Sequence, residues 1–200
     1  MNDHSERAGR DPGAGTLRLL DRVRVAHGHP ESCRGMTLIE LCIVIVILGI
    51  LLVVAVASLQ RARMMANESS AIAIMQTINK AQFAYASECG RGHYAPQLTQ
   101  LGRTRPGRDQ SYLAEDIGLA NFPERNGYRF NVRGGANSIA GLPDCNGAAT
   151  RTTYYASAVP VALSRTGGRS FASSQANGIW QTQGAVPPAE PLGPPAEYVR

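Results

Sequence analysis

Apolar residues are distributed unevenly along the chain. From Leu41 to Gln60, twenty consecutive residues carry no charge, and most of them are Ile, Leu or Val. A helix needs about 20 such residues to cross the hydrocarbon core of a bilayer. The alternative is a buried helix of a soluble protein, but such helices usually keep a polar stripe. The pattern therefore favours a membrane-spanning helix.

The helical pattern continues beyond this run, with apolar residues on one side only. Neither Gly nor Pro occurs between Arg61 and Glu88. Apolar residues recur there at spacings of three and four, which gives an amphipathic stripe: Ala71, Ile74, Ile78, Ala81 and Tyr85. Polar residues between them fit a solvated side, among them Asn67, Glu68 and Asn79. We expect one helix from Thr37 to Glu88, ended by Gly90 and Gly92.

Short strand patterns occupy the second half of the chain. The candidate strands are Tyr128–Val132, Tyr155–Val161, Ser170–Ser173 and Ile179–Thr182. The last two flank Asn177-Gly178, a dipeptide typical of hairpin turns. A strand face and a helix stripe must each bury their apolar side. We therefore expect an α+β fold, in which residues 126–184 form a small antiparallel sheet on the stripe with Trp180 in the core.

These patterns divide the chain into five segments. They are a polar N-terminal arm at 1–35, a transmembrane helix at 36–60, its amphipathic continuation at 61–89, a globular head at 90–185, and a Pro-rich flexible tail at 186–200. The tail has five prolines in fifteen residues, which favours an extended or disordered segment. Short helical turns are expected near Ala95–Leu101 and Tyr112–Leu119.

The charge of the chain does not indicate a nucleic-acid binder. The net charge is +5, and the basic residues are spread along the sequence. The densest cluster, Arg103, Arg105 and Arg108, stands among Gly and Pro and is expected to be a solvated loop. Four arginines before the apolar run favour a cytoplasmic N-terminus: Arg18, Arg22, Arg24 and Arg34. Arg61 and Arg63 on the other side of the run weaken that bias.

Two of the four cysteines, Cys89 and Cys145, fall in the expected head. In an extracytoplasmic domain such a pair favours a disulfide over a metal site. No CxxC motif or His/Cys spacing points to zinc, and we expect no cofactor. The alternative to the disulfide is a pair of buried free thiols.

The residues before the apolar run form a distinctive motif, Arg34-Gly35-Met36-Thr37-Leu38-Ile39-Glu40-Leu41. A charged side chain within a membrane costs about 2.5–3.5 kcal/mol near the helix centre, so Glu40 needs a compensating partner. Cleavage after Gly35 would give Met36 a positively charged α-amino group. Glu40 of one subunit would then pair with the Met36 amine of its neighbour, which would set the axial stagger between packed helices.

In this motif the sequence resembles the type IV prepilin family, which includes the pilins and the pseudopilins of type II secretion. The resemblance implies that prepilin peptidase cleaves between Gly35 and Met36 and methylates the Met36 amine. It also implies a homo-oligomeric filament, assembled by a cytoplasmic ATPase and an inner-membrane platform protein. Three features depart from the family: Met36 stands where Phe is commoner, Ala57 stands where proline is frequent, and the 35-residue leader is long. A translation start at Val23 or Val25 is one explanation of that length.

Two other functions are compatible with parts of this sequence. Ala55-Val56-Ala57 fits a signal-peptidase site that would release a secreted protein beginning at Ser58, but Glu40 and Gly35 argue against it. A membrane-anchored enzyme would need catalytic residues, and the candidates Ser111, Asp116 and His93 are scattered in sequence. We therefore expect a non-enzymatic subunit.

The expected location follows from the same features. The subunit would cross the bacterial inner membrane once with its head outside the cytoplasm, and would then join a periplasmic or cell-surface filament. The length of the region after Gly35, the Pro-rich tail and the expected disulfide favour a pilus subunit over a pseudopilin.

Overall fold

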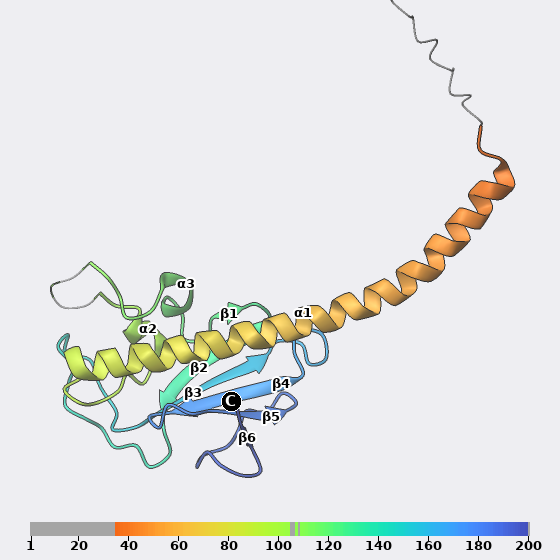
Figure 1. The fold of residues 1–200 in the computed structure, drawn as a ribbon. Coiled ribbons are helices and arrows are strands. Elements are labelled where there is room, and N and C mark those ends of the chain that lie inside the picture. Colours follow the sequence, from red (N-terminus) through yellow and green to blue (C-terminus); the bar gives the residue numbers. More distant parts are fainter. Residues whose placement is uncertain (1–34, 105–106, 108, 200) are drawn as a thin grey trace, which may run out of the picture. The chain divides into compact units, whose positions relative to one another are not determined.

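The described part of the chain forms a long helix, two short helices and one antiparallel sheet (Figure 1). The computed structural model describes residues 35–104, 107 and 109–199. The elements are α1 (Leu38–Glu88), α2 (Leu98–Leu101), α3 (Glu115–Gly118), β1 (Glu124–Arg125), β2 (Tyr128–Gly134), β3 (Tyr154–Pro160), β4 (Arg169–Ser174), β5 (Ile179–Gln183) and β6 (Glu197–Tyr198). The expected α+β class is confirmed. Leader residues 1–34, and Arg105 and Arg108, lie outside the described residues.

Helix α1 begins and ends within one residue of the predicted positions. It contains no proline, and two glycines follow its last turn. The amide of Gly90 donates to the carbonyl of Tyr85 (2.7 Å), and the amide of Gly92 donates to the carbonyl of Ala86 (2.8 Å). Gly92 has a φ of 85°, in the left-handed region that glycine adopts without steric cost. The glycines therefore end the helix as expected.

The strands form an antiparallel meander in the order β1-β2-β3-β4-β5-β6. The four predicted strands correspond to β2, β3, β4 and β5, with ends shifted by at most two residues. β1 and β2 are joined by Asn126-Gly127, whose φ angles of 47° and 73° fit a type I′ hairpin turn. Asn177, with a φ of 60°, lies in the connection between β4 and β5.

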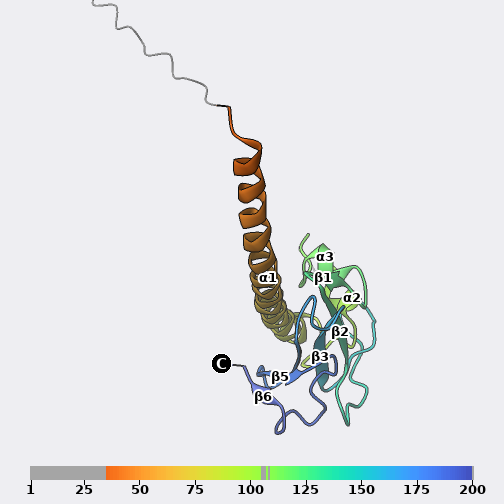
Figure 2. The same ribbon diagram turned by 90° about the vertical axis from the view of Figure 1, so that its right-hand side faces the viewer.

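The core lies between the second half of α1 and one face of the sheet (Figure 2). On β2, Tyr128, Phe130 and Val132 are buried, and the residues between them are more exposed, as expected for a strand with one buried face. The largest fully buried side chains come from both layers: Tyr85, Tyr128, Tyr154, Phe130, Phe171, Met75 and Ile78. The expected packing of a sheet on the helix stripe is confirmed.

The buried stripe of α1 is wider than predicted. Four of its five predicted members are buried, namely Ala71, Ile78, Ala81 and Tyr85. Ile74 is only partly buried, whereas Met75 and Gln82 are completely buried. A sheet covers a broader surface of a helix than a single line of side chains does, so residues on both sides of the predicted line enter the core.

The C-terminal segment contacts the sheet on the face away from α1. The hydroxyl of Ser170 donates to the carbonyl of Gly184 (2.7 Å), and the hydroxyl of Tyr155 donates to the carbonyl of Pro188 (2.5 Å). Near the end of the chain, β6 pairs with β5, and the amide of Val199 donates to the carbonyl of Ile179 (2.8 Å). The prolines predicted a flexible tail, whereas this segment is attached to the sheet. Backbone carbonyls of a Pro-rich segment remain available as hydrogen-bond acceptors.

Trp180 does not occupy the expected place in the core. Its neighbour Ile179 is buried among the core residues, so alternation along β5 directs Trp180 to the other face of the sheet. There Trp180 is partly buried, and its ring packs edge-on against Tyr198 of β6 with 5.6 Å between centroids. The ring of Trp180 therefore packs against the C-terminal segment and not against the core.

Candidate functional site

The N-terminal motif begins α1 with a side-chain cap. The Thr37 hydroxyl accepts a hydrogen bond from the amide of Glu40 (3.3 Å), and the Thr37 carbonyl accepts one from the amide of Leu41 (3.1 Å). These bonds identify Thr37 as the N-cap residue. Glu40 is the acidic residue of the first turn, where its charge interacts favourably with the helix dipole. The Thr-x-x-Glu part of the motif therefore has a local structural function.

The side chains of the motif are exposed. The exposed fraction of Met36 is 62%, and Gly35, Met36, Thr37 and Glu40 line an open surface hollow. The Glu40 carboxylate makes no ion pair or hydrogen bond with another described residue. Its amide, rather than its carboxylate, completes the cap, so the cap does not occupy the carboxylate.

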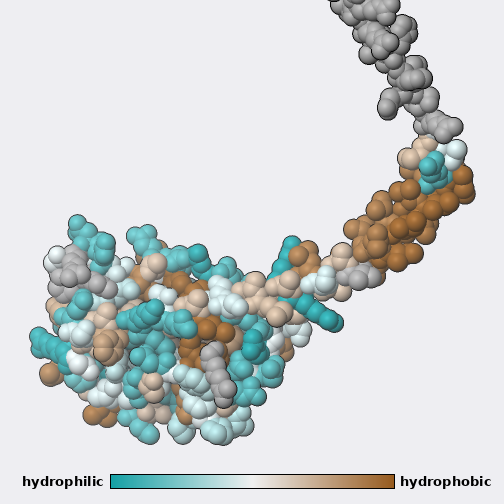
Figure 3. Space-filling model, in the orientation of Figure 1, coloured by the Kyte–Doolittle hydropathy of each residue, from teal (hydrophilic) through white to brown (hydrophobic). Residues whose placement is uncertain are grey.

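The apolar part of α1 is exposed wherever its side chains are described. Its most apolar 18-residue window has a mean hydropathy of 3.3, and none of the described residues in it is buried (Figure 3). Among the described residues, α1 alone is long and apolar enough to cross a membrane. An exposed apolar surface of this extent marks contact with a membrane or with another protein. By itself it does not distinguish a membrane anchor from a signal sequence.

Comparison with known families resolves the nature of the motif. A family model described as the prokaryotic N-terminal methylation motif matches residues 32–56. The chain carries the type IV prepilin signature. The match includes Gly35, Met36, Thr37 and Glu40 together with most of the apolar run. No curated protein and no solved structure gives a match.

The prepilin signature belongs to a class of structural subunits that are anchored in a membrane before assembly, and the exposed apolar helix fits that anchoring. It covers only the beginning of the chain. The head must therefore be understood from its own contacts.

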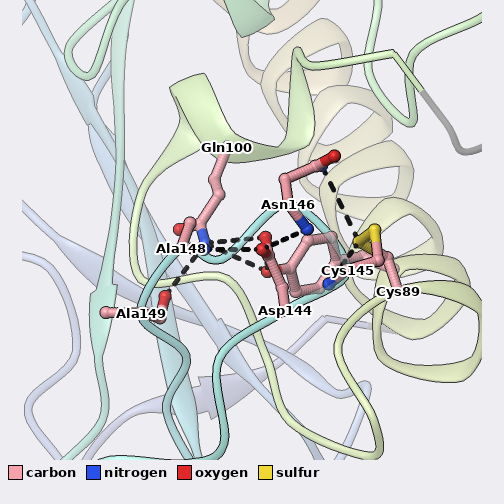
Figure 4. Close-up of a disulfide and its surroundings, with 8 residues drawn as sticks. Cys89, Gln100, Asp144, Cys145, Asn146, Ala148 and Ala149 are labelled. Carbon is pink, nitrogen blue, oxygen red and sulfur yellow. Dashed lines mark hydrogen bonds between the residues drawn. A yellow bond between two sulfur atoms is a disulfide. The ribbon is translucent and has the colours of Figure 1, made fainter.

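A disulfide joins the end of α1 to the long loop before β3 (Figure 4). Cys89 and Cys145 are bonded, with 4.9 Å between their Cα atoms, and the amide of Cys145 donates to the carbonyl of Cys89 (3.0 Å). Cys42, in the apolar part of α1, is a free and exposed thiol. The bridge fixes the C-terminal end of α1 to the head.

Beside this bridge, the buried carboxylate of Asp144 is surrounded by donors (Figure 4). One carboxylate oxygen accepts from the amides of Asn146 (2.8 Å) and Ala148 (2.7 Å). The other accepts from the hydroxyl of Tyr85 (2.7 Å) and from the side-chain amide of Gln100 (3.2 Å). Asp144 thereby links the loop to α1 and to α2.

These donors decide the ionisation of Asp144. Burial alone raises its pKa, but the bonds from Tyr85, the Ala148 amide, Gln100 and the Asn146 amide favour the charged form, and the net result is a lowered pKa. Burial, the bond to Asp144 and the nearby negative charge raise the pKa of Tyr85 far above its ordinary value. The Tyr85 hydroxyl therefore stays protonated at neutral pH and donates to the Asp144 carboxylate, which stays ionised to a lower pH than an ordinary aspartate does.

Polar side chains also fasten the middle of α1 to the sheet. The buried Glu68 carboxylate accepts from the Gly168 amide (2.8 Å) and from two nitrogens of Arg169 (2.8 and 2.6 Å). Asn79 donates to the Ser173 hydroxyl (2.8 Å) and accepts from the Tyr154 hydroxyl (3.0 Å). Glu68 and Asn79 are thus buried and fully engaged, which corrects their expected place on a solvated side.

The scattered catalytic candidates do not come together. Asp116 pairs with Arg125, the Ser111 hydroxyl donates to the Leu113 carbonyl, and a ring nitrogen of His93 contacts the Arg91 carbonyl (3.1 Å). Each side chain is therefore engaged by a residue close to it in the sequence. Within the described ranges, no group of three His, Cys, Asp or Glu side chains is placed to hold a metal ion.

Some functional contacts had a signal in the sequence and others had none. The Thr37-x-x-Glu40 spacing is a capping-box pattern, which would have predicted the helix start. Asp144, followed by Cys-Asn-Gly, has the composition of an Asx turn. In contrast, Glu68 and Arg169 are 101 positions apart, and no local pattern connects them.

Proposed function

We propose that this chain is the precursor of a structural subunit of a type IV pilus-like filament. The observation that carries the proposal is the prepilin signature at the capped start of an exposed apolar helix, with a Glu40 carboxylate that pairs with no other described residue. In this proposal prepilin peptidase cleaves between Gly35 and Met36 and methylates the new amine. The subunit stays in the inner membrane through residues 36–60 until assembly.

Processing is tested by changing the residue before the cleavage site. A Cβ atom added at Gly35 would meet no atom within 4 Å, and the same holds for Gly49. Gly35→Leu should therefore leave the fold intact and accumulate uncleaved precursor in a strain with prepilin peptidase. Gly49→Leu is the matched control and should be cleaved normally. Mass analysis of the wild-type product should give an N-terminus at Met36, with or without one methyl group. A product beginning at Ser58 would instead identify a secreted protein.

Assembly is tested at Glu40. Its carboxylate would pair with the Met36 amine, in its own chain before assembly and in a neighbouring subunit afterwards, and so would reward the correct stagger of the helices. Glu40→Val keeps the backbone amide that donates to Thr37, so the helix cap should survive. We expect the variant to be cleaved, anchored and folded but poorly incorporated into filaments.

Filament yield at matched subunit levels measures this effect, with Ile43→Val as a control in the same exposed stretch. Wild-type yield from Glu40→Val would refute the charge-pair mechanism. Negative-stain imaging after overexpression separates the two kinds of filament. Long surface fibres with the normal assembly ATPase and platform protein support a pilus subunit, and dependence on a type II secretion system supports a pseudopilin.

A further inference from the structure

A small basic hollow lies where α1 leaves its apolar stretch. Gln60 and Arg63 of α1, with Ser164 and Arg165 of the β3–β4 loop, line a surface hollow of about 200 Å³. Figure 3 shows hydrophilic side chains directly after the apolar stretch of the helix. A water molecule occupies about 30 Å³ of liquid, so the hollow has room for a group considerably larger than water.

The two arginines of this hollow have no partner within the described part of the chain. The ion pairs there join other residues, such as Glu68 with Arg169 and Glu190 with Arg133. Arg63 and Arg165 are exposed and make no such pair. Two guanidinium groups therefore converge on one hollow without an anion. Arginine binds phosphate with a planar set of donors, and Gln60 and Ser164 add neutral donors.

The loop that carries Arg165 is fixed against α1 (Figure 1). The side-chain amide of Asn67 donates to the carbonyl of Thr166 (2.9 Å), and Glu68 binds the Gly168 amide and the Arg169 side chain. The Thr166 hydroxyl donates to the carbonyl of Ala162 (3.0 Å) and closes the loop on itself. The hollow is thus held open by the fold and does not depend on a chance approach of two long side chains.

The same loop exposes apolar side chains. Val161, which directly follows β3, and Leu163 have exposed fractions of 45% and 48%. Apolar residues beside arginine are typical of segments that lie in a membrane interface. Arg63 follows Leu59, the last apolar residue of the run, by four residues, or about 6 Å along the helix axis. That distance places the hollow at the level of lipid headgroups if α1 spans the membrane.

We propose that Arg63 and Arg165, with Gln60 and Ser164, bind the phosphate of an anionic phospholipid headgroup while Leu163 enters the interface. This inference rests on the membrane anchoring of α1 and not on filament assembly. The site orients the head on the bilayer before the subunit is withdrawn into a filament. It also gives a role to Arg63, which topology alone does not require.

Arg61 provides a matched control for the experiment. It has the same charge and lies two residues from Arg63, which is about 200° around the helix, and it does not line the hollow. The full-length chain is placed in nanodiscs of phosphatidylcholine with an equal fraction of phosphatidylglycerol. Native mass spectrometry then counts the lipids of each kind that remain on the subunit after the disc is removed.

We expect the wild type to retain phosphatidylglycerol in preference to phosphatidylcholine. Arg63→Gln and Arg165→Gln should each lower this preference about fivefold, the usual effect of one arginine near an anionic surface. Arg61→Gln should leave it within about twofold of the wild type. Leu163→Ser should lower the total lipid retained. Because Arg63 and Arg165 have no partner in the described structure, their variants should unfold at the wild-type urea concentration.

Several results would overturn the site. An equal loss of preference in Arg61→Gln would indicate a diffuse attraction of charge, and no preference in the wild type would exclude the site altogether. Unchanged lipid retention in Leu163→Ser would mean that the loop does not reach the bilayer. If the Arg63 and Arg165 variants bind lipid normally but form few filaments, the arginines contact a neighbouring subunit instead. Normal lipid preference without any filament would refute the proposed function alone.

Discussion

The hydrogen bond between Tyr85 and Asp144 offers a sharp test of how the head is held to α1. Tyr85→Phe removes one hydroxyl and keeps the ring, which packs edge-on against Tyr112 with 5.6 Å between centroids. The lost hydroxyl donates to the buried Asp144 carboxylate at 2.7 Å and accepts from Gln100 at 3.0 Å. The substitution therefore changes the polar network and leaves the apolar packing in place.

The expected cost follows from the charge of the acceptor. A hydrogen bond to a charged group contributes about 1.5–3 kcal/mol to stability, against about 1 kcal/mol for a neutral pair. In Tyr85→Phe the Asp144 carboxylate keeps the Gln100 amide and two backbone amides as donors. We therefore expect the free energy of unfolding to fall by about 1.5–3 kcal/mol at pH 7.

This cost should depend on pH. The pKa of Asp144 in the folded protein lies below its ordinary value of 3.8, so the unfolded chain binds more protons in the interval between the two values. The stabilisation by the ionised carboxylate is complete above the unfolded pKa, and it is lost as the pH falls through the folded pKa. The difference between Tyr85→Phe and the wild type should accordingly shrink in acid.

Urea unfolding of the full-length chain in detergent, followed by near-ultraviolet circular dichroism, measures the effect between pH 7 and pH 3. The control is Tyr154→Phe, which removes the same atom from a bond to the neutral side chain of Asn79. That variant should lose about 1 kcal/mol at every pH in this range. If Tyr85→Phe lost no more stability than Tyr154→Phe, and its loss did not change with pH, the ionised Asp144 carboxylate would not be the stabilising acceptor.

Three further predictions concern the head. Thiol labelling of the oxidised protein should leave Cys89 and Cys145 unmodified, and labelling of both without a reductant would exclude the bridge. Because the sequence separation is 56, replacing both by serine should lower the free energy of unfolding by about 4 kcal/mol. Ile78→Asp places a charge at a fully buried position and should abolish cooperative unfolding. Thr77→Asp, on the exposed side of α1, should change the free energy of unfolding by less than about 0.5 kcal/mol. Equal stability of the two variants would contradict the packing of α1. Burial raises the pKa of Tyr155 to about 12 from 10.0. The contribution of its protonated hydroxyl to stability is therefore complete below pH 10, and it is lost as the pH rises through about 12. Tyr155→Phe should lose less stability than the wild type over that alkaline interval in the same unfolding assay.

The sequence predicted the elements whose signals are local. The apolar run, the absence of glycine and proline after it, and the glycines at its end determine the bounds of α1. Alternation along β2 determines which of its side chains are buried, and Asn177-Gly178 marks the connection between β4 and β5. Each of these signals arises within a few residues, where steric and burial preferences act directly.

The polar contacts and the tail were not predictable in this way. Glu68 and Asn79 have the composition of a solvated helix side, and they are buried only because Arg169 and Ser173 arrive from about a hundred residues away. The expected place of Trp180 in the core was wrong, because the side of β5 that it occupies depends on the register of the strand. Of the candidate site, the sequence supplied the motif, and the structure added the helix cap formed by Thr37.

The attachment of α1 to the head has a mechanical consequence. In the proposed filament, a subunit under tension would be pulled along the axis of α1, and the load would reach the head first at Asn67 and last at Cys89. The contacts between them lie side by side along α1, so a pull must shear them together instead of peeling them one by one. The final attachment is a covalent bond, which holds when the others have yielded. In single-molecule pulling on the helix and the C-terminus, reductant should therefore release the extra chain length that the closed loop withholds under oxidising conditions. The absence of that added length would show that the disulfide bears no load.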